Sequence, residues 1–191
     1  MARPPQTARS ERTREALRQA ALVRFLAQGV EDTSAEQIAA DAGVSLRTFY
    51  RHFTSKHDLL FADYDAGLQW FRSALAARPK GEPVVESVQA AIFAFPYDVE
   101  AVTRIAALRA EELDPERIVR HIRQVEADFA DAVAERLRIA DPADPLRVAV
   151  AARCIGAAVF AAMEVWMLGQ ERSLAELARM CRTALDSLSN L

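Results

Sequence analysis

The chain has few of the residues from which metal centres and catalytic sites are usually built. Its 191 residues include two cysteines and three histidines. Cys154 and Cys181 are far apart and belong to no C-x-x-C pair, so they are expected to be ordinary buried thiols. His52 and His57 fall in a segment with another interpretation, and His121 has no nearby nucleophile motif. The sequence therefore predicts no enzyme, no metal site and no cofactor.

Long apolar runs are also absent. The first residues lack the apolar core of a signal peptide, and the most apolar stretch, residues 148–165, is interrupted by Arg153 and Glu164. We therefore expect a cytoplasmic protein that does not interact with a membrane. About half of the residues (51%) are hydrophobic, enough for one large or two small domains without disulfide bonds.

No segment shows a convincing strand pattern, whereas apolar spacings of three and four recur along the whole chain. Caps, prolines and glycines mark where helices begin and end. The sequence predicts an all-α fold, with helices over Arg12–Gln28, Ser34–Ala42, Ser45–Phe53, Ser55–Arg78, Pro83–Phe95, Asp98–Glu112, Pro115–Ile139, Pro145–Leu168 and Ser173–Ser189.

The segment 34–53 has the pattern of two short helices joined by a tight turn. Ser34 and Gln37 form a capping box, and Gly43 supplies the left-handed conformation that ends a helix. Ser45 caps the second helix, whose Phe49 and Phe53 lie four residues apart and are expected to face inward. This arrangement is typical of a helix-turn-helix.

The outer side of the second helix carries side chains suited to duplex DNA, namely Leu46, Arg47, Thr48, Tyr50, Arg51 and His52. A major groove about 12 Å wide admits one helix, whose N-terminal residues meet the base edges. Arg47 and Thr48 lie in that first turn and are predicted to contact bases. Tyr50, Arg51 and Lys56 suit phosphates, and the helix N-termini at Ser34 and Ser55 offer free N–H groups.

Charge is distributed unevenly along the chain. Residues 1–58 contain nine Lys and Arg against seven Asp and Glu, whereas the remainder contains 15 against 20. The first eighteen residues are more basic still, with five arginines against two glutamates. The part that precedes the first helix is either a basic arm that touches the DNA backbone or minor groove, or a solvated tail.

The run from Thr33 to Leu60, TSAEQIAADAGVSLRTFYRHFTSKHDLL, closely resembles the DNA-binding domain of the tetracycline-repressor (TetR) family of bacterial transcription regulators. The resemblance implies a homodimer of about nine helices per subunit, with a DNA-binding domain over residues 1–54 and a helical effector-binding and dimerisation domain over residues 55–191. It also implies phosphate contacts for Tyr50, Lys56 and either Thr33 or Ser34, and base contacts for Arg47 and Thr48. Leu46 departs from the family pattern, and a thymine methyl is its expected partner.

Two further groups of residues are assigned with the help of this resemblance. Small and apolar residues on the last two helices predict a dimer interface formed by Ala151, Ile155, Ala158, Val159, Ala162, Leu177, Cys181 and Leu185. Aromatic and methionine residues on the helices that surround the family's effector pocket predict an apolar site lined by Trp70, Phe71, Phe93, Phe95, Tyr97, Met163, Trp166 and Met167. Plain core packing explains either group as well.

The sequence thus predicts a homodimeric DNA-binding regulator. The expected mode is repression at a palindromic operator of double-stranded DNA, relieved by a small apolar or amphipathic effector. A transcriptional activator of the same fold, and a helical partner-binding protein without effector control, remain as alternatives. The partner-binding alternative leaves the caps, the glycine turn and the cluster of Arg47, Tyr50, Arg51 and Lys56 without a function.

Overall fold

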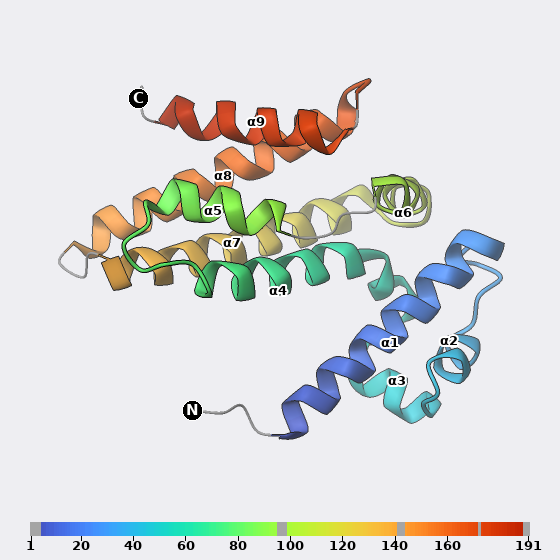
Figure 1. The fold of residues 1–191 in the computed structure, drawn as a ribbon. Helices are drawn as coiled ribbons and strands as arrows, with labels where there is room; N and C mark the ends of the chain where they lie inside the picture. The colour runs from blue at the N-terminus through green and yellow to red at the C-terminus, as the bar shows by residue number, and fades with distance from the viewer. Residues whose placement is uncertain (1–4, 95–98, 141–143, 172, 189–191) are drawn as a thin grey trace. The chain divides into compact units, whose positions relative to one another are not determined.

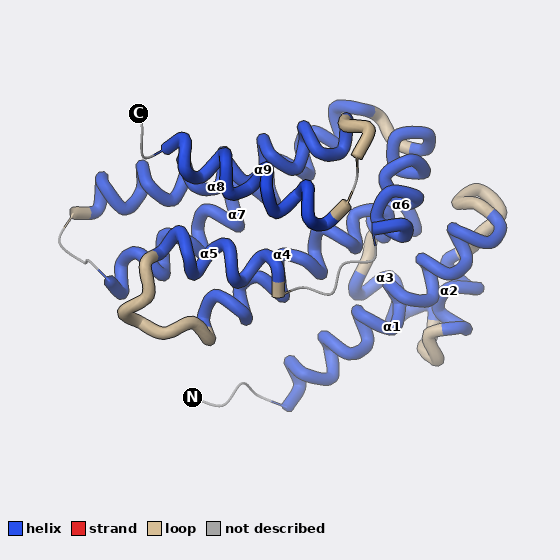
Figure 2. Tube along the Cα trace, turned by 45° about the horizontal axis from the view of Figure 1, so that its top comes forward, coloured by secondary structure: helices blue, strands red, loops and turns tan. Residues whose placement is uncertain are grey.

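The computed structural model describes residues 5–94, 99–140, 144–171 and 173–188. Within these ranges the chain forms helices and loops and no strand (Figures 1 and 2). The predicted all-α fold is therefore confirmed. The elements are α1 (Pro5–Gln28), α2 (Ala35–Asp41), α3 (Leu46–His52), a 3₁₀ helix η1 (Lys56–Phe61), α4 (Ala62–Ala76), α5 (Val84–Phe93), α6 (Val99–Glu112), α7 (Pro115–Ala140), α8 (Pro145–Leu168) and α9 (Leu174–Ser187).

The chain divides into two compact units, and neither is a single stretch of sequence. Unit 1 comprises Met1–Asp63 and Thr103–Ile118, and unit 2 comprises Tyr64–Val102 and Val119–Leu191. The helix-turn-helix therefore shares a unit with η1 and with most of α6. The chain crosses between the units within α4, within α6 and within α7.

The core of unit 1 is formed by buried side chains of α1, the loop after it, α2, α3 and η1. These side chains include Leu17, Phe25, Val30, Ile38, Phe49 and Leu60. Arginine side chains connect α6 to this core. Arg104 donates to the carbonyl of Leu26 (3.1 Å), and Arg109 donates to that of Leu60 (2.8 Å) while pairing with Asp63. Arg109 is almost completely buried, because these partners satisfy its charge.

Three predicted helix boundaries were wrong. Helix α1 begins at Pro5 rather than Arg12, so Arg9 lies on the helix and not on a flexible arm before it. Arg3 lies outside the described residues. The segment predicted as one helix from Ser55 is a 3₁₀ turn followed by α4, and α4 already ends at Ala76.

The start of η1 is fixed by the carboxylate of Asp58. It accepts from the backbone N–H groups of Thr54 (2.9 Å) and Ser55 (3.0 Å) and from the Thr54 hydroxyl (2.6 Å). Burial alone would raise the pKa of Asp58, but these hydrogen bonds and the nearby Arg117 lower it. Asp58 therefore stays charged and holds the turn that follows α3.

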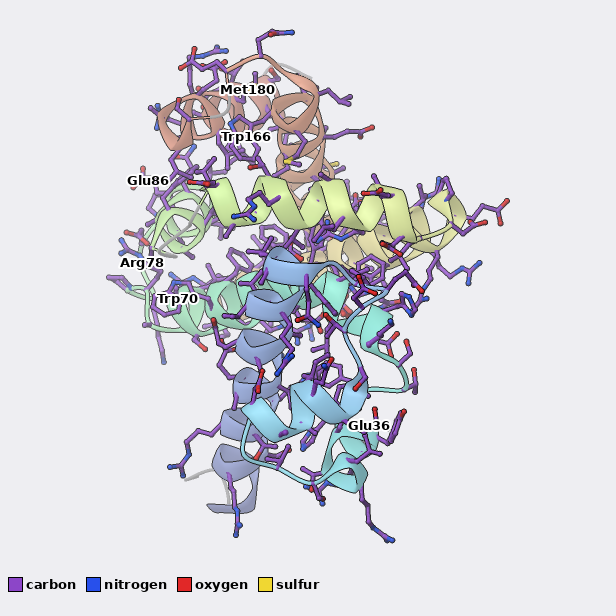
Figure 3. The ribbon with its side chains drawn as sticks, turned by 90° about the vertical axis from the view of Figure 1, so that its right-hand side faces the viewer. Glu36, Trp70, Arg78, Glu86, Trp166 and Met180 are labelled. Carbon is purple, nitrogen blue, oxygen red and sulfur yellow. The ribbon has the colours of Figure 1, made fainter. Side chains whose placement is uncertain are left out.

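Unit 2 has a core shared by α4, α5, α7, α8 and α9. The rings of Phe71 on α4 and Phe129 on α7 stack with centroids 4.0 Å apart. Helix α8 approaches α7 closely at Gly156, where an added Cβ atom would come within 3.3 Å of the Ala130 Cβ. A second cluster between α8 and α9 contains Trp166 and Met180, which Figure 3 labels.

Helix α8 is long and apolar enough by composition to span a bilayer, and it is the one such helix among the residues searched. One whole side of α8 is nevertheless buried in unit 2, including Val148, Ile155 and Trp166. Its length and composition are those of a core helix that also has an apolar outer face.

Candidate nucleic-acid interface

The first helix of the predicted helix-turn-helix, α2, begins with the expected capping box. The hydroxyl of Ser34 accepts from the Gln37 N–H (3.2 Å), and the Gln37 side-chain oxygen accepts from the Ser34 N–H (2.9 Å). The side of α2 that carries Ala35, Ile38 and Ala39 is buried. The cap and the buried face together fix α2 against α1.

The turn after α2 is a Schellman motif. Gly43 has a φ of 65°, and its N–H donates to the carbonyl of Ala40 (3.0 Å). The Val44 N–H donates to the carbonyl of Ala39 (2.9 Å), which completes the paired bonds of this motif. The predicted left-handed glycine is therefore confirmed, and it sets the direction in which the chain enters α3.

The second helix, α3, is held by a cap at one end and by two aromatic rings on its inner face. The Ser45 hydroxyl accepts from the Thr48 N–H (3.2 Å). Phe49 and Phe53 are buried as predicted, and their ring centroids are 6.0 Å apart. Helix α3 is therefore rigidly oriented, with its remaining side chains on the outside.

The outer side of α3 presents the side chains predicted to meet DNA. Arg47, Tyr50 and Arg51 are exposed, and Tyr50 retains 53% of its accessible surface. Leu46 and Thr48 are half-buried, and the Thr48 hydroxyl lies 3.0 Å from that of Ser45. These contacts leave the two arginines and the tyrosine as the most accessible polar groups on the helix.

The structure gives internal partners to two residues predicted to bind phosphate. Thr33 is 1% exposed and its hydroxyl donates to the carbonyl of Gly29 (2.7 Å), so it is inaccessible to a phosphate and stabilises the loop after α1. The predicted contact at Thr33 is therefore wrong, and Ser34 is the accessible member of that pair. Lys56 donates to the carbonyls of Val30 (2.7 Å) and Glu31 (3.1 Å), which leaves one of its three donors.

His52 is half-buried at the end of α3. Burial lowers its pKa, and the nearby positive charges of Arg51 and Arg14 lower it further. Its Nε2 atom is enclosed by protein and has no hydrogen-bond partner. His52 is thus held in its neutral form, with one ring nitrogen unavailable to DNA.

An ion pair that sequence reasoning missed holds α1 against α2. Arg24 makes two parallel hydrogen bonds to the Asp41 carboxylate, at 2.5 and 3.0 Å. This hydrogen bonding raises the pKa of Arg24 and lowers that of Asp41. The two residues are 17 positions apart, so no local spacing could have indicated the pair.

Comparison with known proteins agrees with this geometry. Residues 17–62 match the family model described as bacterial regulatory proteins of the tetR family. The chain is 31% identical over 190 residues to the HTH-type transcriptional regulator TcmR of Streptomyces glaucescens, an alignment that covers 93% of this chain and 83% of TcmR. The chain belongs to the TetR family. Its members are DNA-binding transcriptional regulators and not enzymes.

Solved structures of TetR-family regulators share the fold. A regulator from Mesorhizobium loti is 23% identical, with a TM-score of 0.57 over 95% of this chain and 97% of the other. SmeT, the repressor of the Stenotrophomonas maltophilia multidrug efflux pump SmeDEF, is 25% identical, with a TM-score of 0.55 over 91% of this chain and 87% of SmeT.

The residues predicted to line an effector pocket in this TetR-family regulator do not form one group. Trp70 is 43% exposed and lies at the surface of α4 (labelled in Figure 3), which makes it the most exposed of the predicted pocket residues that the structure describes. Phe71 is buried in the main cluster of unit 2, and Trp166 is buried between α8 and α9, where its indole donates to the carbonyl of Ser173 (3.0 Å).

The other predicted pocket residues lie nearer to one another. Phe93 and Met163 are half-buried and pack against both apolar clusters of unit 2, and Met167 packs against the smaller one. Phe95 and Tyr97 lie outside the described residues. The junction of the two clusters is therefore the part of unit 2 where predicted pocket residues meet.

The residues predicted to form the dimer interface are mostly inside the subunit. Ile155, Val159 and Leu185 belong to the main cluster, and Ala162, Leu177 and Cys181 to the smaller one. Ala151 and Ala158 are half-buried beside them. The prediction was wrong for the buried residues, because α8 has two apolar faces and periodicity alone does not show which one faces its own subunit.

The outer face of α8 carries a second apolar stripe. It runs the full length of the helix at spacings of three and four, and all of its residues are exposed: Leu146, Val150, Cys154, Ala157, Ala161, Val165 and Leu168. The exposed charged residues Arg147, Arg153 and Glu164 lie along its edges. An apolar stripe of this length is typical of a surface that another helix covers.

Proposed function

We propose that this TetR-family regulator is a homodimeric repressor that binds a palindromic operator and leaves it when a small apolar or amphipathic effector binds. The observation that carries the proposal is the outer side of α3, where Arg47, Tyr50 and Arg51 are exposed on a helix capped by Ser45 and anchored by buried phenylalanines. A rigid, short, basic helix of this kind fits a major groove.

Individual contacts follow from position on α3. Arg47 and Thr48 lie in its first turn and meet base edges, with Leu46 against a thymine methyl. Tyr50, Arg51 and the remaining donor of Lys56 contact phosphates, and the α2 N-terminus at Ser34 adds a further phosphate contact. His52 makes no direct contact through Nε2.

Dimerisation is proposed through the outer stripe of α8. A single recognition helix contacts too few base pairs for a specific site, whereas two helices related by a two-fold axis read the two halves of a palindrome. The second copy is the occupant that the stripe suits, because its small residues Ala157 and Ala161 allow an identical helix to approach closely.

The proposed domain roles are DNA binding for residues 1–54 and effector binding and dimerisation for residues 55–191. The effector is proposed to bind at the junction of the two apolar clusters, against Phe93, Met163 and Met167. Two solved structures that share this fold are complexes, one of SmeT with triclosan and one of Thermus thermophilus FadR with lauroyl-CoA. Both of these ligands have large apolar parts.

Release from DNA follows from a difference in effector affinity between two arrangements of the units. The chain crosses between them three times, so a ligand in unit 2 can favour an arrangement with the wrong spacing of the two α3 helices. A nearly complete shift requires about 5.5 kcal/mol of preference, divided between two sites in a dimer. The protein is proposed to act in the cytoplasm, where its operator lies.

Fluorescence anisotropy with labelled DNA from immediately upstream of the chain's own coding sequence tests this function. Arg47→Ala should cost about 1–3 kcal/mol and relax the preference at one base pair. Tyr50→Phe should weaken binding to all sequences alike, because it removes only a phosphate donor. Arg138→Ala, which removes an exposed arginine from α7 in unit 2, should leave the affinity unchanged.

A reporter assay separates repression from activation. Deletion of the regulator should raise transcription from a promoter that overlaps the operator if it represses, and lower transcription if it activates. If Arg47→Ala and Tyr50→Phe bind the labelled DNA with unchanged affinity, the proposed interface is contradicted. If the protein were instead a helical protein that binds only protein partners, it would not bind the labelled DNA at all.

A further inference from the structure

Three metal-ligating side chains from distant parts of the sequence meet within unit 1. Glu31 follows α1, His57 lies on η1 and Glu112 is the last residue of α6. One donor atom of each lies within 4.8 Å of the other two, and the His57 Nε2 atom is 3.8 Å from a Glu31 carboxylate oxygen. No local spacing joins residues 31, 57 and 112, so a search for ligand motifs along the sequence could not find this cluster.

The residues around His57 are bonded to the parts of unit 1 on which the two glutamates lie. Lys56, the preceding residue, donates to the backbone carbonyl of Glu31 itself. On the other side, Arg109 of α6 donates to the carbonyl of Leu60, and Arg117 donates to Asp58 (2.7 Å). The three elements are therefore held together without an ion, and an ion would order only the side chains.

The donor set selects a class of ion. One imidazole nitrogen with two carboxylate oxygens suits first-row divalent transition metals such as Zn²⁺, whereas Mg²⁺ and Ca²⁺ prefer oxygen ligands alone. Bonds of about 2.0–2.2 Å to one ion require donors within about 4.2 Å of each other. Because the side chain of Glu31 is 75% exposed, it can make this small adjustment without disturbing the core.

The local charge also favours a cation. Two carboxylates converge here, and Glu112 stands at the C-terminal end of α6, where the helix dipole is negative. The ammonium of Lys56 already interacts with two carbonyl groups and adds one positive charge nearby. A bound divalent ion offsets the repulsion between the two carboxylates.

We propose that Glu31, His57 and Glu112 bind one divalent transition-metal ion, with water in the remaining positions. The ion connects the loop after α1, η1 and the end of α6, so its binding stabilises the unit that contains the helix-turn-helix. This site is separate from the proposed effector position in unit 2, and its ligands are not among the proposed DNA contacts.

The test uses the untagged full chain after treatment with a chelator and titration with CoCl₂, followed by competition with ZnCl₂. We expect one Co²⁺ per chain, visible as ligand-field absorption, displaced by Zn²⁺, and accompanied by a higher Tm. His57→Ala and the nearly isosteric Glu112→Gln should each raise the Kd for Co²⁺ at least about tenfold.

Matched controls lie next to the ligands. Glu111→Gln and Asp32→Asn remove the same charge one position away from the cluster and should change the Kd by less than about twofold. Circular dichroism of each variant checks that it is folded. The proposal is overturned if the untagged chain shows no saturable binding near one equivalent, or if His57→Ala and Glu112→Gln both bind Co²⁺ as tightly as the original chain. Neither result depends on binding to DNA.

Discussion

Gly43 sets the direction in which the chain leaves α2 and enters α3. Its left-handed conformation allows the two backbone bonds that end α2, and α3 begins only three residues later. A Cβ atom added at Gly43 would meet nothing within 4 Å, so the need for glycine is purely conformational.

Gly43→Ala should therefore destabilise the protein by about 1–2 kcal/mol, the cost of a left-handed conformation at a residue with a side chain. Gly67→Ala is the matched control. Gly67 lies within α4, has ordinary helical dihedral angles and also has open space around it, so alanine there should stabilise by about 0.5–1 kcal/mol. Urea unfolding of the two variants measures both changes, and equal effects of the same sign would refute the argument.

Glu82 provides a test of the electrostatics of unit 2. Hydrogen bonds from Arg78, and then from the buried Ser87, lower the pKa of Glu82 from 4.5 to about 2. Because the pKa is lower in the folded state, the carboxylate contributes stability that is fully present above about pH 4.5. That contribution is lost as the pH falls towards 2.

Glu82→Gln should accordingly reduce the free energy of unfolding at pH 7 and have a much smaller effect at pH 2.5. Glu86→Gln on α5 removes the same charge from an exposed side chain nearby and should have little effect at either pH. Denaturant unfolding at the two pH values compares the variants. A loss from Glu82→Gln that is the same at both pH values would show that the carboxylate charge is not responsible.

At the level of the element, the sequence predicted α2, α3 and their caps well, because each is determined by residues three or four positions apart. It failed at Thr33, whose hydroxyl donates to a carbonyl that only the folded loop brings near, and it did not show that Lys56 donates to the carbonyls of Val30 and Glu31. It also placed the start of α1 too late, since a run of polar and basic residues has no apolar stripe to reveal a helix.

Helix α8 shows the limit of periodicity most clearly. Both of its sides carry apolar or small residues, and the side that the sequence analysis assigned to the dimer is packed inside the subunit. Ile155 and Val159 pack inside the subunit, whereas Val150 and Val165 face outward. Which stripe is internal depends on α7 and α9, whose contacts with α8 are not encoded in α8 itself.

Val150→Glu should therefore weaken the dimer, since it places a charge within the outer stripe of α8. Val23→Glu is the control, because Val23 is another exposed valine, on α1 in unit 1. Sedimentation velocity at micromolar concentration should show dimers for the original chain and Val23→Glu, and a shift towards monomer for Val150→Glu. Dimers of unchanged stability in Val150→Glu would exclude this stripe as the interface.

Cysteine labelling gives a second readout of the same surface. Cys154 lies on the outer stripe and is exposed in one copy, whereas burial raises the pKa of Cys181 to about 11. At pH 8 the reaction of Cys154 should slow as protein concentration rises and become fast again in Val150→Glu. Cys181 should react only on unfolding, because its thiolate is scarce and its side chain is enclosed.

For the molecule as a whole, the division into units was the least predictable feature. A boundary drawn after residue 54 follows the motif, but residues 55–63 and 103–118 also belong to the compact unit that contains it. The reason lies in Arg109 and Arg117, which reach from the α6–α7 region to residues 49 and 59 positions earlier. Long-range contacts of this kind leave no periodic trace in the sequence.

The central claim is that two copies of α3 read duplex DNA together. Hydroxyl-radical footprinting of the upstream DNA, with the stoichiometry measured on the same complex, tests it most directly. We expect two protected patches related by two-fold symmetry, with centres one helical turn or a multiple of it apart, about 34–36 Å per turn, and two chains per operator. A single patch occupied by one chain, or unchanged protection by Arg47→Ala at protein concentrations below saturation, would contradict it.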